Sequence, residues 1–214
     1  AVDTLWLGLS DKQRENVQSV CMDFWKAYIS GARRHAPQAD IVFDRFHVTK
    51  HLNEAVDKVR KKEHRDLCRQ KNTRLSNTKY LWLKNPNNWT EKDRDRYAVL
   101  AENQLAVGRA WNRKELFREF WSLETIKEAE VFFKHWYFSA THSRLKPVIE
   151  IAKMLNRHLE GLLAWIKHHV SNGLVEGFNS KIQQIKSIAR GFRDVKNYRI
   201  AILFHLGGLD MIPH

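Results

Sequence analysis

The stretch VCMDFWKAYISGARRHAPQADIVFD, residues Val20–Asp44, decides the predicted fold. It holds two short apolar runs, Val20–Met22 and Ile41–Phe43, and an aspartate follows each run. The second run is β-branched and aromatic, as buried strands are, whereas the first is too short to be told from a helix by pattern alone. Between the runs, apolar residues recur at the spacing of one helix face: Trp25, Tyr28, Ile29 and Ala32. A strand, a helix and a strand in this order predict a βαβ unit with two parallel strands.

From Lys50 onward the pattern is helical almost to the end of the chain. Amphipathic helices are predicted over 91–120, 124–138, 147–170, 174–190 and 195–206. The predicted fold class is therefore α+β and predominantly α-helical. We expect three parts: a small αβ part in 1–60, a helical block in 61–165, and helices in 166–214 that return to the αβ part.

Composition excludes several classes of protein. The chain has 214 residues, of which 43% are hydrophobic and 11% aromatic, so disorder is not expected. Its longest apolar runs are only a few residues, too short for a membrane-spanning helix, and no secretory leader opens the sequence. The two cysteines make neither a disulfide framework nor a zinc motif. A reducing cytoplasm is the expected compartment.

The net charge of +13 points to a polyanionic partner, most often a nucleic acid. Residues 50–79 contribute strongly, with ten Lys and Arg against four acids. The candidate DNA contacts are Lys61, Lys62, Lys181, Lys186, Arg190 and Arg193. The alternative for each of them is an ordinary solvated helix surface.

Two carboxylates follow the predicted strands. Ligands of parallel α/β sheets bind at the carboxyl ends of the strands, where Asp23 and Asp44 are expected. Asp23 is equally well explained as an N-cap of the next helix. Asp44 and His47 are three residues apart and can meet across one helical turn, which more often makes a structural hydrogen bond than a metal site. Zinc usually takes four ligands, so this pair alone is a weak metal motif.

A third acid, Glu176, lies in the first turn of the helix predicted over 174–190. It falls roughly opposite the apolar stripe of that helix, on a polar face flanked by basic residues. An acid in a first turn is favoured by the helix dipole, which is its simpler explanation. An acid on a basic face also suits a metal ion near a phosphate backbone.

Two long segments carry a resemblance to a known family. They are Val20–Arg60 and the string SNGLVEGFNSKIQQIKSIARGFRD, residues Ser171–Asp194. Both strongly resemble the bacterial insertion-sequence transposases of the ISL-three family, and the similarity extends through LWLKNPNNWT (Leu81–Thr90) and HWYFSATHSRLKP (His135–Pro147). It covers essentially the whole chain.

The resemblance implies a DDE transposase with an RNase H-like core. Such enzymes hold two divalent ions, Mg²⁺ or Mn²⁺, with three carboxylates, and the ions promote in-line displacement at phosphorus. Carried over to this sequence, the second acid falls on Asp23 and the final acid on Glu176. Asp44 and His47 match a supporting D-x-x-H signature, and Asp44 remains the alternative second acid. Residues 61–165 then form a helical insertion within a partial core of about two strands.

The first acid of such a site has no match in this chain, because the family carries it on a strand upstream of these residues. Asp3 has no strand pattern around it. We therefore expect a C-terminal fragment of the enzyme that cannot catalyse transposition alone. The alternatives are a non-catalytic DNA-binding or assembly module and a helical interaction domain that binds no nucleic acid.

The resemblance also implies partners. We expect DNA, both transposon ends and target, a homo-oligomer, no membrane, and a cytoplasmic protein that associates with the nucleoid while it acts on DNA. An exposed edge on the short sheet favours pairing with a second chain.

Overall fold

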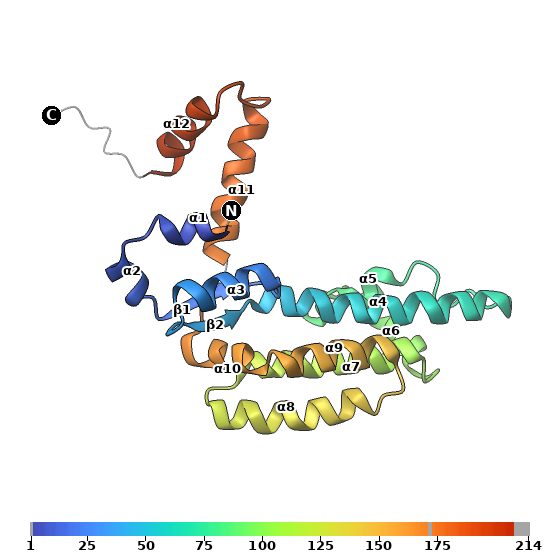
Figure 1. Ribbon diagram of the computed structural model, residues 1–214. Coiled ribbons are helices and arrows are strands. Elements are labelled where there is room, and N and C mark those ends of the chain that lie inside the picture. Colours follow the sequence, from blue (N-terminus) through green and yellow to red (C-terminus); the bar gives the residue numbers. More distant parts are fainter. Residues whose placement is uncertain (1, 171–172, 208–214) are drawn as a thin grey trace. The chain divides into compact units, whose positions relative to one another are not determined.

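A computed structural model describes residues 2–170 and 173–207, without the side chains of 173–176, 178 and 179 (Figure 1). The chain divides into two compact units, Ala1–Val170 and Ser171–His214, and each is described by itself.

The first unit is built mainly from helices. Its elements in chain order are α1 (Val2–Leu7), α2 (Asp11–Glu15), β1 (Ser19–Met22), α3 (Lys26–His35), β2 (Asp40–Phe43), α4 (Arg45–Arg69), α5 (Lys79–Leu83), the 3₁₀ helix η1 (Pro86–Asn88), α6 (Glu91–Ala101), α7 (Ala106–Phe117), the 3₁₀ helix η2 (Arg118–Ser122), α8 (Ile126–Thr141), α9 (Lys146–Arg157) and α10 (Leu159–His168). The second unit contains α11 (Gly173–Ile188) and α12 (Val195–Leu206). The predicted class, α+β and predominantly α-helical, is confirmed.

The βαβ unit forms as its apolar runs predict. β1 and β2 pair in parallel, in a register that joins Ser19 to Asp40 and Met22 to Phe43. Each strand begins one residue before its apolar run, because Ser19 and Asp40 take part in the ladder. The helix between the strands begins at Lys26, and the preceding residues form the turn out of β1.

Two helices pack against this short sheet. α3 contacts β1, and α10 contacts β2 although it lies more than a hundred residues further along the chain. Gly161 allows α10 to approach closely. A Cβ atom at Gly161 would overlap the ring of Phe43 and lie 2.9 Å from the carbonyl oxygen of Ile41.

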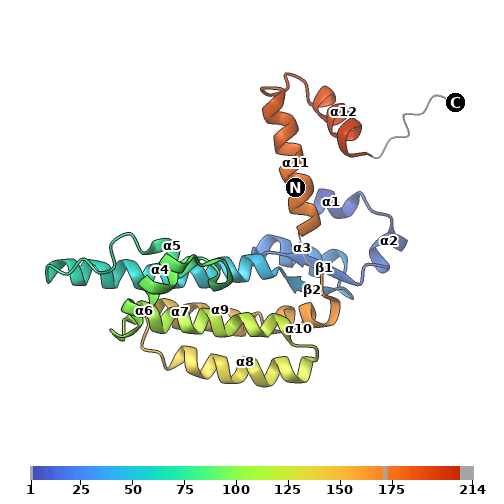
Figure 2. The ribbon, with the colours of Figure 1, turned by 180° about the vertical axis from the view of Figure 1, so that it is seen from behind.

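The remaining helices form a bundle around one aromatic core. α4 packs against α5, α7 and α9, and α8 covers α7 and α9, as both views show (Figures 1 and 2). The largest fully buried side chains include Trp82, Phe117, Phe120, Phe133 and Trp136. Most of the large aromatic side chains of the middle segment therefore form core, as their helical spacing indicates, whereas Tyr80 and Phe138 are exposed.

Two of the predicted helices are interrupted. The helix expected over 91–120 is divided into α6 and α7, because Gln104 has a left-handed backbone with φ of 47° and Leu105 is extended. The helix expected over 147–170 breaks at His158, which has φ of −116° and ψ of 19°. This break separates α9, which contacts α4, from α10, which contacts β2.

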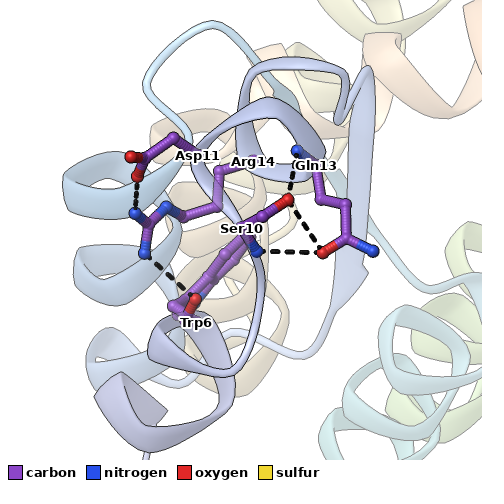
Figure 3. Close-up of polar contacts among 5 residues, drawn as sticks. All are labelled: Trp6, Ser10, Asp11, Gln13 and Arg14. Atoms are coloured by element: carbon purple, nitrogen blue, oxygen red, sulfur yellow. Dashed lines mark hydrogen bonds and ion pairs between the residues drawn. The ribbon is translucent and has the colours of Figure 1, made fainter.

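A small polar cluster fixes the beginning of α2. Ser10 and Gln13 form a reciprocal capping box, in which each side chain accepts a backbone N–H of the other residue. The guanidinium of Arg14 pairs with Asp11 and donates to the carbonyl oxygen of Trp6 at 3.3 Å (Figure 3). The cluster links α1, whose Trp6 is buried, to α2.

The second unit is a pair of helices joined by a short turn. α11 ends where Arg190 and Gly191 adopt positive φ angles of 52° and 95°, and Gly191 N–H donates to the carbonyl of Lys186 at 2.9 Å. Asp194 then caps α12 by accepting the N–H of Lys196 at 2.8 Å.

Candidate functional site

The carboxyl ends of β1 and β2 lie at one edge of the sheet and carry two aspartates. Asp23 directly follows β1, and Asp44 directly follows β2. The strand ladder continues to this point, because Asp44 N–H donates to the carbonyl oxygen of Met22 at 3.1 Å. The structure therefore brings both predicted acids to the same edge.

Asp23 is half-buried and is held by a single backbone contact. Its Oδ1 accepts the N–H of Trp25 at 3.0 Å, which closes a turn over residues Asp23–Trp25. The N-cap of α3 is Trp25 itself, so the interpretation of Asp23 as that cap is wrong. Among the hydrogen bonds of the described residues, none uses the second oxygen of Asp23.

Asp44 has a different environment. It is only 3% exposed and is the N-cap of α4, where its Oδ1 accepts the N–H of Phe46 at 3.4 Å. The expected hydrogen bond between Asp44 and His47 is absent from the contacts of residues 2–170. His47 is half-buried and meets the ring of Phe46 edge-on at 5.6 Å. Asp44 thus organises the start of α4 without help from His47.

An aromatic and histidine cluster beside Asp23 was not predicted. The ring of Phe24 stacks on Phe43 at 4.5 Å and lies 5.6 Å from His51 and 5.2 Å from His158. Burial, with a further contribution from the charge of Arg157, lowers the pKa of His158. No spacing in the sequence joins these residues, because α4 and the α9–α10 junction meet only in the folded chain.

Glu176 lies in the first turn of α11, as predicted. Its side chain is outside the described residues, and it belongs to the second unit, whereas Asp23 belongs to the first. Within the part of the chain that the structure describes, no three His, Cys, Asp or Glu side chains gather as metal ligands. The pairing of Asp23 with Glu176 therefore stays a prediction.

Asp3 has a structural environment unlike that of Asp23. It lies in α1, and its Oδ1 accepts from Arg34 at 3.1 Å and lies 2.8 Å from Nε2 of His35. Its pKa is lowered, first by the hydrogen bond with His35. These contacts tie α1 to α3, and Asp3 lies within a helix and not directly after a strand.

The predicted basic residues of α4 lie on its exposed face. Lys61 is exposed, but its Nζ is 2.9 Å from Asp57, which also pairs with Arg60 at 2.7 Å. Burial raises the pKa of Asp57, but the hydrogen bonds from Lys61 and Arg60 outweigh it, so the net pKa is lowered. Lys62 is exposed and has no ion-pair partner among residues 2–170. It is therefore the better placed of the two predicted lysines for an external anion.

The second unit carries the other predicted basic residues. Lys181 and Lys186 lie on α11, and Arg190 and Arg193 lie in the turn before α12. All four are exposed, and none forms an ion pair with another described residue. They are accessible to a polyanion, although nothing in their arrangement identifies one.

The described helices also bear on the membrane prediction. No helix in residues 2–170 and 173–207 is long and apolar enough to cross a bilayer.

Comparison with known protein families decides the class of this chain. A family model described as a transposase, of the ISL-three group of DDE transposases, matches residues 1–202. The chain belongs to the ISL-three family of transposases. The resemblance seen in the sequence is therefore confirmed over nearly its full length.

Two similar proteins place this transposase chain among insertion-sequence products. It is 28% identical over 191 residues to the transposase for insertion sequence element IS1001 of Bordetella parapertussis. The aligned residues make up 88% of this chain and 47% of that protein. It is 31% identical over 125 residues to the transposase for insertion sequence element IS1557 of Mycobacterium tuberculosis (strain CDC 1551 / Oshkosh). Here the aligned residues make up 58% of this chain and 28% of that protein. The transposase chain thus spans less than half the length of these relatives. No solved structure matches it.

Proposed function

We propose that this transposase chain supplies two of the three metal-binding carboxylates of a DDE active site, Asp23 and Glu176. The observation that carries the proposal is the position of Asp23. It directly follows β1 at the carboxyl edge of the sheet, half-buried, with one carboxylate oxygen outside its turn. The family match over residues 1–202 supports the same assignment. Asp44 is buried and caps α4, which favours a supporting role for it.

The donors at this edge suit Mg²⁺ or Mn²⁺, because both ions prefer carboxylate oxygens. The described side chains alone do not complete a site, since they form no cluster of three ligands. Glu176 would supply one missing oxygen donor. We place the third acid outside these 214 residues, since Asp3 is held by Arg34 and His35.

In such a site, two bound ions would activate the attacking hydroxyl and stabilise the leaving oxygen of a phosphodiester. The residues of this chain hold the acids of the carboxyl edge in position for that chemistry. The N–H of Trp25 fixes the orientation of the Asp23 carboxylate, and Asp44 fixes the first turn of α4 beside it. DNA, both transposon ends and target, is the proposed substrate, in agreement with the net charge of +13. Assembly into a homo-oligomer stays a prediction.

The test is DNA cleavage by a transposase that includes this chain. Asp23→Asn keeps an oxygen for the N–H of Trp25 but removes the charge, so we expect Mg²⁺-dependent cleavage to fall by at least about 10³-fold while DNA binding persists. Asp95→Asn, at an exposed acid of α6, is the matched control and should cleave normally.

Two outcomes would change the assignment. Cleavage retained by Asp23→Asn and lost in a folded Asp44→Asn would move the second catalytic acid to Asp44. Cleavage unaffected by either change, with DNA binding intact, would favour a non-catalytic DNA-binding or assembly module.

A further inference from the structure

A groove of 520 Å³ lies along the C-terminal half of α4. Its other walls are the first residue of α7 and the segment Arg144–Pro147, which ends the connection from α8 and begins α9. Both ribbon views place this end of α4 and the start of α9 at the end of the bundle away from β1 and β2 (Figures 1 and 2). The groove is therefore separate from the carboxyl edge that carries Asp23.

Four basic side chains from two distant segments line the groove: Lys58, Lys62, Arg144 and Lys146. All four are exposed. Lys146 has only a weak contact with Glu150, at 4.0 Å, and the other three have no ion-pair partner within residues 2–170. The backbone of Arg144 is left-handed, with φ of 62°, and its neighbours Ser143 and Leu145 are buried. The core thus fixes the position of this turn opposite α4.

The groove is also lined by two acids, and both already have partners within the chain. The carboxylate oxygens of Glu63 accept the N–H groups of Ala106 and Val107, at 2.7 and 2.8 Å, and so cap the start of α7. Asp66 pairs with Arg69 at 3.2 Å. The groove lining thus carries four basic side chains against two acids, and this excess of positive charge favours an anion.

The separation between the groove and the carboxyl edge follows from the length of α4. Lys62 lies 18 residues beyond the cap Asp44, which corresponds to about 27 Å along the helix axis. One strand of duplex DNA rises about 3.4 Å per nucleotide, so the same distance spans about eight base pairs. About eight base pairs is therefore the spacing expected for one straight duplex that contacts both places.

We propose that this groove binds the phosphodiester backbone of duplex DNA about eight base pairs from the carboxyl edge. The inference rests on the proposed function only in taking transposon DNA as the ligand. Lys58 and Lys62, one turn apart on α4, face one side of the backbone, and Arg144 and Lys146 face the other. Contacts of this kind position a duplex and carry no sequence information.

The test compares two variants that lose the same charge. The groove variant combines Lys58→Gln, Lys62→Gln and Arg144→Gln, and the control variant combines Arg94→Gln, Lys127→Gln and Lys134→Gln, which are exposed residues outside the groove. Binding of the 214-residue chain to a fluorescent 30-base-pair duplex is measured by anisotropy between 0.05 and 0.5 M salt. Circular dichroism confirms that both variants are folded.

We expect the groove variant to bind roughly tenfold or more weakly at 0.1 M salt, with a salt slope smaller by about 2 to 3, since each phosphate contact contributes about 0.9. The control variant should keep the wild-type slope. Equal losses in both variants would overturn the proposal, because the charge would then act diffusely. Equal competition by polyglutamate would overturn DNA as the ligand. Neither result depends on cleavage, so Asp23→Asn tests the proposed function separately.

Discussion

At the residue scale, Asp40 joins two segments that are far apart in the sequence. Its Oδ2 accepts the ammonium of Lys167 at 2.7 Å and lies 2.7 Å from Nε2 of His168. These contacts tie the first residue of β2 to the last turn of α10. Hydrogen bonds from His168 and then Lys167 hold the pKa of the Asp40 carboxyl below its ordinary value of 3.8.

The lowered pKa predicts a pH-dependent contribution to stability. The ionised form of Asp40 is favoured in the folded chain, so its contribution is complete above pH 3.8 and is lost as the pH falls through the lower, folded pKa. Asp40→Asn should lower the free energy of unfolding by about 0.5–1 kcal/mol at pH 7, a modest figure because the site is partly exposed.

Urea unfolding at pH 7 and at pH 3 or below tests this prediction. The difference between wild type and Asp40→Asn should shrink at the lower pH. Asp95→Asn, which removes an exposed acid without an ion-pair partner in residues 2–170, is the control and should have little effect at either pH. A difference that does not change with pH would contradict the role of the Asp40 charge.

At the element scale, the contact of α10 with β2 depends on a residue without a side chain. A glycine within a helix usually costs stability, so its replacement by alanine is normally favourable by about 0.5–1 kcal/mol. Gly161 should behave in the opposite way, because a Cβ atom there would overlap the ring of Phe43, which is itself stacked on Phe24. The backbone carbonyl of Ile41 limits any adjustment on the same side.

We therefore expect Gly161→Ala to destabilise the fold by about 1–3 kcal/mol, as overpacked cores do. Gly108 of α7 provides the matched control, because a Cβ atom there would meet nothing within 4 Å. Gly108→Ala should be neutral or stabilising by about 0.5–1 kcal/mol. Thermal unfolding of both variants measures the difference, and equal behaviour would show that α10 can move away from β2 at little cost.

At the scale of the whole molecule, we propose that this chain can bind DNA but lacks part of the catalytic site. The 214-residue chain carries the basic groove and Asp23, but the third carboxylate is placed outside it. We expect the purified chain to bind duplex DNA in Mg²⁺ without cleaving it, which gel electrophoresis of a labelled transposon-end duplex would show. Cleavage that is lost in Asp23→Asn would show instead that these residues hold a complete site.

Local features of the fold could be predicted from the sequence, and features made by distant segments could not. The parallel strands follow from two apolar runs, and the aspartates at their ends mark one edge of the sheet. No glycine or proline lies at His158 to mark the break between α9 and α10. This break lets α9 pack against α4 and α10 pack against β2, two contacts that exist only in the folded chain. For the same reason the groove was missed, because Lys58 and Arg144 are 86 residues apart.

The helix α4 is long enough to connect the carboxyl edge with the basic groove. Its first turn is held by Asp44 at the carboxyl edge, and its far half forms one wall of the basic groove. α4 also packs against α5, α7 and α9, so the bundle keeps Lys62 about 27 Å from Asp44. A duplex that contacts both places must therefore present its phosphates at that spacing.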